Sequence, residues 1–168
     1  DKYMRILIFS QYFWPENFRI NDIACDLKAR GHEIEVITGK PNYPDGKFFS
    51  GYSYWGIGQE LWKDILIYRL PIFARGSNSK FELALNFFSF IVSGFLLAPW
   101  LLRRSKYDVI FVYGVSPIFQ AIPASFLGWL KRAPVVLWIQ DLWPQSAVAL
   151  GHVKSPIFLK LLGKFVRF

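Results

Sequence analysis

Residues 5–38, RILIFSQYFWPENFRINDIACDLKARGHEIEVIT, decide the fold of this chain. Residues 6–9 form an unbroken apolar run, which is typical of a strand buried on both faces of a parallel sheet. A polar pair, residues 10–11, ends this run. From residue 18 to residue 30 the apolar side chains recur at helical spacing, and Ile34, Val36 and Ile37 begin a second strand. The stretch therefore predicts a strand, a loop, a helix and a second, parallel strand.

The predicted helix carries signals at both of its ends. Asn17 is expected to cap its start, because an asparagine side chain accepts hydrogen bonds from the free N–H groups of a first turn. Lys28 and Arg30 suit the negative end of the helix dipole, and Gly31 suits the left-handed conformation that often ends a helix. The crossover between the two strands is expected to be right-handed.

A strand–helix–strand unit of this kind binds its ligand in the crevice at the carboxyl ends of its strands. In this chain those ends lead into residues 11–19 and residues 39–47, so we expect both segments at one rim. The second segment continues as an aromatic-rich loop to residue 55, which predicts a substrate wall or a membrane-facing flap. A surface loop that packs only on itself is the alternative.

The length of 168 residues suits one domain with a substantial core, or one half of a two-domain protein. Residues 156–168 still carry a helical pattern, so we expect the sequence to be a piece of a longer protein. Residues 1–3 precede Met4 and are interpreted as a tag remnant, which leaves 4–168 as the domain. No basic segment followed by an apolar run precedes the first strand, and we expect no secretory signal.

The composition is 53% hydrophobic and 19% aromatic, with a net charge of +8, which predicts exposed apolar surface or membrane contact. The sequence has no run of Lys and Arg, no RNA-binding motif and no zinc-ligand spacing, so nucleic acid is not an expected partner. The single Cys25 excludes an intramolecular disulfide and fits a reducing cytoplasm.

Residues 83–102 contain no charged side chain, and a helix of that length is just able to cross a hydrocarbon core. Asn86, Ser89 and Ser93 recur at helical spacing, however, and Pro99 interrupts the last turn. We therefore expect a helix with one side buried against the sheet and the other facing a bilayer or a second domain. A wholly buried core helix remains the alternative.

Further apolar runs predict strands within residues 61–71, 107–113 and 135–139, with a helix from residue 117 to about residue 131. Residues 156–168 form a basic amphipathic pattern. This pattern is typical both of a helix on an anionic membrane and of a sheet-covering helix with a charged solvent face.

The order of these elements predicts a doubly wound α/β domain, a Rossmann-like parallel sheet flanked by helices. Its first loop, residues 10–21, contains no glycine, so neither the dinucleotide-binding fingerprint nor the P-loop is available to hold a diphosphate. A dehydrogenase is therefore a poor fit. Gln140 and Asp141 follow directly from the strand at 135–139, and this polar pair at the rim is the strongest positional indication of chemistry.

Three segments together resemble the N-terminal half of GT-B glycosyltransferases of family 4. They are residues 4–46, with YFWPENFRIN and the phrase GKPNYPDGK that runs on to residue 47, residues 107–117, YDVIFVYGVSP, and residues 133–146, APVVLWIQDLWPQS. The sequence looks closest to bacterial members that build O-antigen and capsular polysaccharide, including N-acetylfucosamine transferases. The resemblance covers residues 4–168.

In that family two such domains face each other across a cleft, with the acceptor bound to the N-terminal domain and the nucleotide sugar to the C-terminal one. The sugar is transferred with retention of anomeric configuration and without a metal or other cofactor, because basic side chains and helix N-termini neutralise the leaving diphosphate. The resemblance therefore implies an acceptor-binding domain that does not turn over alone, since the donor-binding domain lies outside this sequence.

The implied partners are the nucleotide-sugar donor, a polyprenyl-diphosphate-linked saccharide acceptor and the membrane surface. The implied location is the cytoplasmic face of the bacterial inner membrane. A non-catalytic peripheral membrane-binding α/β module, using the same apolar and basic surfaces, is the alternative function.

The resemblance also implies site residues. Many members carry His-Asp where this chain has Gln140-Asp141, so we expect these two at the catalytic position, with Asp141 binding acceptor or sugar hydroxyls. The expected substrate-binding residues are Glu16, Asn17, Arg19, Asn42, Tyr43, Asp45, Tyr113 and Ser116. Residues 16–19 replace paired glycines of the family, so Arg19 is expected to supply charge and Asn17 a hydroxyl contact. A purely structural role, with Asn17 as a cap and Arg19 paired to Glu16 or Asp22, is the alternative.

Overall fold

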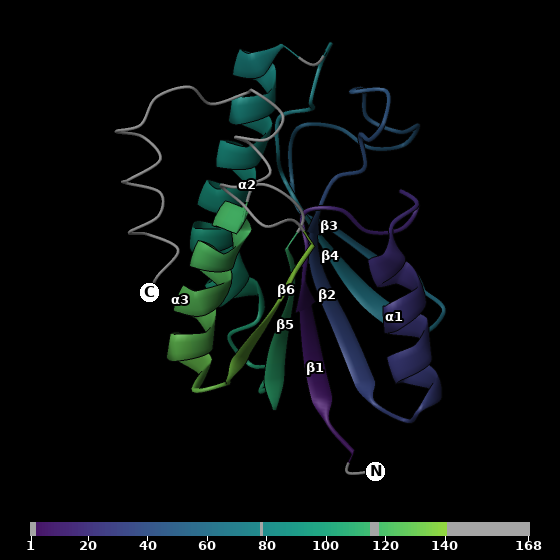
Figure 1. Cartoon of the computed structure of the whole chain (residues 1–168), viewed down its shortest axis with the longest axis vertical. Helices are drawn as coiled ribbons and strands as arrows, with labels where there is room; N and C mark the ends of the chain where they lie inside the picture. The colour runs from purple at the N-terminus through teal and green to yellow at the C-terminus, as the bar shows by residue number, and fades with distance from the viewer. Residues whose placement is uncertain (1–2, 78, 115–117, 141–168) are drawn as a thin grey trace.

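The computed structural model describes residues 3–77, 79–114 and 118–140, and its centre is a six-stranded sheet. The strands lie in the order β3-β4-β2-β1-β5-β6 (Figure 1). Their bounds are β1 Arg5–Phe9, β2 Glu33–Gly39, β3 Gly58–Trp62, β4 Ile65–Leu70, β5 Val109–Gly114 and β6 Val135–Ile139. The helices are α1 Arg19–Ala29, α2 Lys80–Leu101 and α3 Ala121–Lys131, and a 3-10 turn, η1, spans Ile118–Gln120.

The predicted doubly wound fold is confirmed. β1 pairs in parallel with β2 on one side, where Ile6 lies opposite Ile34, and with β5 on the other, where Ile6 lies opposite Val109. The chain therefore builds outward from β1 in one direction through β2 and β4, and then returns to the other side of β1 through α2. The carboxyl ends of β1 and β5 form the switch point at which such sheets bind ligands.

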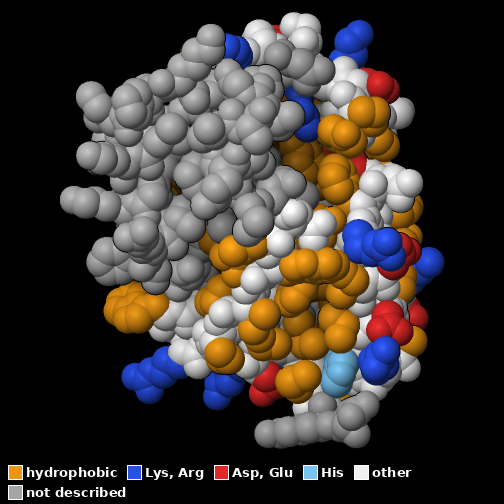
Figure 2. Space-filling model, viewed as in Figure 1, with side chains coloured by type: hydrophobic (Ala, Val, Ile, Leu, Met, Phe, Trp, Pro, Cys, Tyr) orange, Lys and Arg blue, Asp and Glu red, His pale blue; other side chains and the backbone are white. Residues whose placement is uncertain are grey.

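Helices cover the two faces of the sheet unequally (Figure 1). α2 and α3 pack on one face, over a core that includes Leu7, Phe9 and Phe90. α1 packs on the other face, over a core that includes Ile8 and Ile20. On this second face, beyond α1, hydrophobic side chains gather at the surface over the strands (Figure 2).

The edge strand β3 was absent from the sequence prediction. It pairs antiparallel with β4, and the turn between them places Lys63 and Asp64 at positive φ, 48° and 59°. Residues of β3 alternate between half-buried and exposed, because only one side of an edge strand meets the protein. Its sequence, GQELW, therefore lacks the apolar run that marked the other strands.

The predicted cap of α1 was wrong. The helix begins at Arg19 with Phe18 as its N-cap residue, and no cap side chain bonds to its first turn. Asn17 is exposed just outside the helix. The loop is held instead by Asn21, whose Oδ1 accepts from the Trp14 N–H at 2.9 Å and whose Nδ2 donates to the Glu16 carbonyl at 2.7 Å.

α2 has one buried and one exposed side from Asn86 onward, as predicted, and the alternative of a wholly buried helix was wrong. Asn86, Phe90, Gly94 and Ala98, spaced four residues apart, are buried. An apolar stripe on the opposite side, Phe88, Val92, Leu96 and Trp100, is 63%, 37%, 69% and 58% exposed. By length and composition alone α2 is able to cross a membrane. Its buried side packs on β4 and α3, which makes it part of the sheet domain. The helix predicted at residues 156–168 lies outside the described residues.

Candidate functional site

The rim at the carboxyl ends of the strands is organised by the buried carboxylate of Glu16, which is only 1% exposed. Its Oε1 accepts from the backbone N–H groups of Asn42 and Tyr43, both at 2.8 Å, and its Oε2 accepts from the Phe13 N–H at 3.4 Å. One side chain thus joins the loop after β1 to the loop after β2, as the shared rim predicted. Burial raises the pKa of Glu16 to about 7, although the three N–H donors and nearby Arg69 act in the opposite direction.

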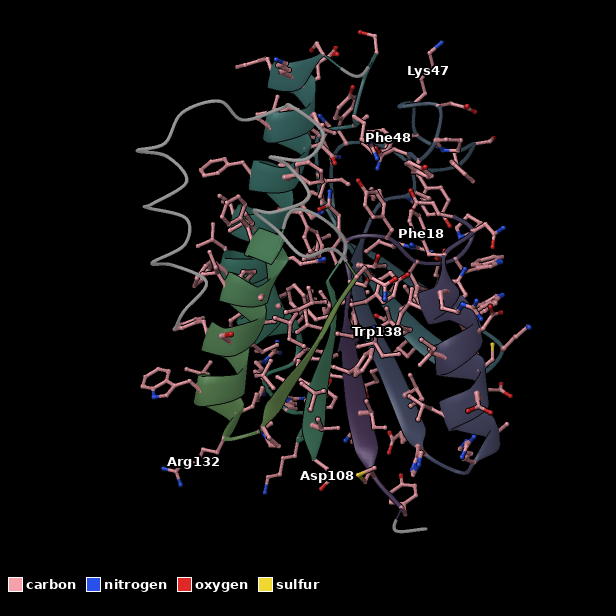
Figure 3. The ribbon with its side chains drawn as sticks, viewed as in Figure 1. Phe18, Lys47, Phe48, Asp108, Arg132 and Trp138 are labelled. Atoms are coloured by element: carbon pink, nitrogen blue, oxygen red, sulfur yellow. The ribbon has the colours of Figure 1, made fainter. Side chains whose placement is uncertain are left out.

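Three aromatic rings line this rim. Tyr12 stacks on Phe18 with ring centroids 4.9 Å apart, and Tyr43 lies 5.2 Å from Phe18 and 5.8 Å from Tyr12. Phe18 stands where the loop after β1 enters α1 (Figure 3). Tyr43 is 37% exposed, so it presents an accessible edge of the cluster. Aromatic surfaces of this kind stack on the apolar faces of ligands.

Arg75 places a positive charge against the aromatic cluster. Its guanidinium lies 5.0 Å from the centre of the Tyr43 ring, and its Nη1 donates to the Tyr12 hydroxyl at 3.2 Å. Its backbone N–H donates to the Asn42 Oδ1 at 3.0 Å, which fixes the segment after β4 to the loop after β2. Within the described residues no ion pair includes Arg75, and its buried Nε has no hydrogen-bond partner. The site therefore holds a cation suited to a phosphate or carboxylate oxygen.

A buried amide network lies beneath the switch point. The Gln120 Oε1 accepts from the Gln11 N–H at 2.9 Å, and the Gln120 Nε2 donates to the Tyr113 carbonyl at 2.7 Å. The Gln11 Nε2 donates to the Asn86 Oδ1 at 2.7 Å. Because these bonds join the ends of β1 and β5 to η1 and α2, they fix the floor of the crevice.

Arg69 of β4 also holds this rim in place, through an ion pair and hydrogen bonds. Its side chain is fully buried and pairs with Glu60 of β3, with Nε to Oε1 at 2.7 Å. It also donates to the carbonyls of Gly39, the last residue of β2, and of Trp14, in the segment after β1. The rim is therefore fixed before any ligand binds.

The structure brings several of the predicted site residues together. Glu16, Asn42 and Tyr43 meet directly, and Asp45 is exposed on the same loop. Asn42 is fully buried, and Glu16 uses both oxygens within the protein. A ligand contact by Glu16 would require opening these hydrogen bonds, so its role in the structure is to position the loop.

The remaining predicted residues are more dispersed. Asn17 and Arg19 are exposed on either side of Phe18. Among the described residues, no ion pair joins Arg19 to Glu16 or to Asp22, so that alternative was wrong. The Tyr113 side chain packs in the core under α1, with its ring 5.6 Å from that of Trp138.

Gln140 is exposed directly after β6, and its N–H donates to the Gly114 carbonyl at 3.0 Å. It therefore stands beside the end of β5 at the rim. Asp141 and Ser116 lie outside the described residues. No cluster of metal-ligating side chains occurs in the parts of the chain that the structure describes.

Sequence reasoning missed Gln11, Tyr12, Arg75 and Gln120 as site residues. Gln11 and Tyr12 follow the first strand directly, which is the same signal that singled out Gln140. Asn86 was noted only for its spacing in the long helix, although an amide in an apolar helix needs a buried partner. Arg75 stands alone in a loop, and nothing in the local sequence places it beside Tyr12.

Comparison with known proteins agrees with this fold. The family model for the glycosyl transferase 4-like domain matches residues 17–168. A curated relative in Escherichia coli, named "Putative colanic acid biosynthesis glycosyl transferase WcaI", is 34% identical over 155 residues, covering 88% of this chain and 37% of its own. The chain thus spans little more than a third of that relative.

A solved structure, the C-terminal domain of the PF1911 hydrogenase from Pyrococcus furiosus, aligns with a TM-score of 0.51 at 16% identity, over 82% of this chain and 92% of that one. At that identity the likeness concerns the fold alone. The family match covers most of the chain, including every loop of the rim after Glu16. The chain therefore belongs to the glycosyl transferase 4-like family.

Proposed function

We propose that this chain is the acceptor-binding, N-terminal domain of a two-domain retaining glycosyltransferase that builds a bacterial surface polysaccharide. The observation that carries the proposal is the prearranged rim, in which an aromatic cluster and the cation Arg75 meet in the segments that follow β1, β2 and β4. The family match supports transfer of a sugar, and the name of the related WcaI protein supports a polysaccharide product. The donor is a nucleotide sugar held by a second domain.

The rim offers the contacts that a saccharide acceptor needs. The exposed edge of Tyr43 and the neighbouring Phe18 form a surface for the apolar face of a sugar ring. Gln140 and Asp141 supply amide and carboxylate groups for its hydroxyls. Binding energy at this rim would orient the acceptor hydroxyl toward the anomeric carbon of the donor, which is the positioning that transfer between two bound substrates requires.

The exposed stripe of α2 supports action at a membrane. Phe88, Val92, Leu96 and Trp100 form a continuous apolar line, and Arg103 lies over the Trp100 ring at 5.1 Å. Arg103 and Arg104 follow at its end, and both are exposed. Apolar side chains flanked by Trp and Arg suit the interface of an anionic bilayer. We place the protein on the cytoplasmic face of the inner membrane, where a polyprenyl-diphosphate-linked saccharide presents its sugars.

Transfer by the complete protein tests this proposal. A labelled sugar supplied as its nucleotide derivative should lengthen a lipid-linked saccharide by one residue without added metal. Asp141→Ala should lower the transfer rate by about a hundredfold, the lower range for a residue acting on a reacting hydroxyl.

Asp26→Ala is the matched control, because Asp26 is an exposed carboxylate of α1 whose one ion pair within the described residues is with Arg30, at the end of that helix. Its transfer rate should equal that of the unmodified protein, and both variants should melt at the same temperature. Equal rates for Asp141→Ala and the unmodified protein would contradict the assigned site.

A further inference from the structure

An apolar groove lies beside the rim, between α2 and the aromatic loop. It has a volume of about 650 Å³ and is lined by residues 54–56, residues 71–73 and one side of α2 between residues 85 and 93. This volume is within the range of ligand sites, ~300–1,000 Å³. In Figure 1 the half of α2 nearer its N-terminus extends past the sheet on the side where the loops gather.

The lining gives a ligand few hydrogen-bonding side chains. Ser89 and Ser93 are its hydroxyls on α2, and both are already bonded to backbone groups. The Ser89 Oγ donates to the Asn86 carbonyl at 2.8 Å and accepts from the Phe73 N–H at 3.0 Å, and the Ser93 Oγ donates to the Pro71 carbonyl at 2.6 Å. The other side chains from α2 in the lining are Leu85, Phe88 and Val92. The groove therefore favours an aliphatic chain over a sugar.

Both walls are held in place. Lys40 is 5% exposed, and its Nζ donates to the carbonyl of Trp55, which fixes the aromatic wall to the end of β2. Tyr54 packs on Phe73 and on Phe48, with ring centroids 6.0 and 4.7 Å away. Figure 3 shows Phe48 in this loop, beside the labelled Lys47. The groove is thus a formed site and not a gap between loose loops.

The groove has a cation close to one end. Phe73 lines the groove, and Arg75 follows two residues later, at most ~7 Å along the chain. Arg75 stands against Tyr12 and Tyr43 at the rim described above. An apolar trough with a guanidinium near it that forms no ion pair within the described residues complements a lipid with an anionic phosphate head.

We propose that this groove binds the first isoprene units of a polyprenyl diphosphate, with Arg75 on the diphosphate and the attached sugar on the Tyr43 rim. The inference rests on the proposed function for its choice of an isoprenoid lipid. The rest of the lipid tail has an exit, because Phe88 and Val92 belong both to the groove and to the exposed stripe of α2. The tail therefore passes from the groove along Leu96 toward the bilayer.

Calorimetric titration of the complete protein with farnesyl diphosphate, farnesol and inorganic diphosphate tests this assignment. Farnesyl diphosphate should bind at least tenfold more tightly than either of its parts. Val92→Trp fills the groove and should weaken farnesyl diphosphate tenfold or more. Leu130→Trp, which introduces the same side chain at an exposed position on α3 outside the groove, should change the affinity less than twofold. Arg75→Gln should weaken farnesyl diphosphate while leaving farnesol unchanged.

A second pair of variants distinguishes a loss of the groove from a loss of folding. Phe88→Asp puts a charge into the groove, and Phe81→Asp puts the same charge on an exposed site of the same helix. Only Phe88→Asp should weaken farnesyl diphosphate. Equal effects of the two members of either pair would overturn the groove assignment. Binding of inorganic diphosphate, or of a lysophospholipid, as tightly as farnesyl diphosphate would overturn it as well.

The groove assignment and the proposed function are contradicted by different results. Normal sugar transfer by Val92→Trp to a lipid-linked saccharide would remove the groove from the account and leave the transferase standing. Groove-dependent binding of farnesyl diphosphate, in a protein that transfers no sugar from any donor, would do the reverse.

Discussion

Glu16 shows how one residue joins the segments that form the site. Its carboxylate is shielded from water, and its stabilising partners are backbone N–H groups from three positions, Phe13, Asn42 and Tyr43. Desolvation exceeds these contacts, which is why the pKa of Glu16 rises to about 7. Its sequence neighbourhood predicted a polar residue at the rim, but not that the polar group would be buried.

The raised pKa of Glu16 gives the fold a pH dependence. From pH 4.5 to about 7 the folded protein holds a proton on Glu16 that the unfolded chain has released, so the free energy of unfolding falls as pH rises through this window. The loss attributable to Glu16 is on the order of 3 kcal/mol. Glu16→Gln removes this titration and keeps an acceptor oxygen. In urea unfolding, the free energy of unfolding of this variant should therefore fall less between pH 5 and pH 8 than that of the unmodified protein, by about 3 kcal/mol.

Comparing the unmodified protein with Glu16→Gln isolates the contribution of Glu16, because every other titrating group is common to both. Equal losses of stability in the two proteins between pH 5 and pH 8 would show that the Glu16 proton does not couple to folding. Glu33→Gln, which alters a partly exposed carboxylate at the opposite end of β2, should leave the loss of stability nearly unchanged.

At the scale of elements, the sequence predicted what depends on local patterning. The β1, β5 and β6 strands were recognised from apolar runs, and β2 from Ile34, Val36 and Ile37. The two sides of α2 follow from the spacing of Asn86 and Ser93 in an apolar helix. The edge strand β3 escaped prediction because it is stabilised by pairing with β4 rather than by burial of its own side chains. The amide network of Gln11, Asn86 and Gln120 escaped because its members are up to 109 residues apart.

The exposed stripe of α2 predicts salt-sensitive binding to membranes. Vesicles containing anionic lipid should co-sediment with the protein, and the bound fraction should fall as ionic strength rises, because salt screens the attraction of the basic residues. The double variant Arg103→Glu/Arg104→Glu should weaken binding by roughly tenfold or more, since each basic residue near such a surface contributes about 1 kcal/mol.

The control is the double variant Lys28→Glu/Arg30→Glu at the end of α1, which changes the net charge equally but away from α2. It should retain most of the vesicle binding. If both double variants lose the same amount, total charge governs the binding and the stripe of α2 has no special part in it.

At the scale of the whole molecule, the doubly wound sheet could be read from one strand–helix–strand unit, because that pattern fixes the position of β1 and the side on which the crevice opens. The site could be read only in part. Gln140 was singled out by its position directly after a strand, whereas Tyr43 was named from the resemblance of its loop to the family. Arg75 reaches the rim from a loop whose path depends on Asn42 and Tyr12, and those contacts are set by the folded chain.

The central claim is that this domain binds the acceptor. Separate KM values for the acceptor and for the nucleotide sugar test it most directly. In the complete protein, KM should be measured for the lipid-linked acceptor and for the nucleotide sugar. Tyr43→Ala is compared to Trp129→Ala, which removes a still larger aromatic side chain at an exposed site on α3. Tyr43→Ala should raise the acceptor KM roughly tenfold, as expected for losing an aromatic contact of about 1.4 kcal/mol, and leave the nucleotide-sugar KM unchanged. A raised KM for the nucleotide sugar with an unchanged KM for the acceptor would contradict the account.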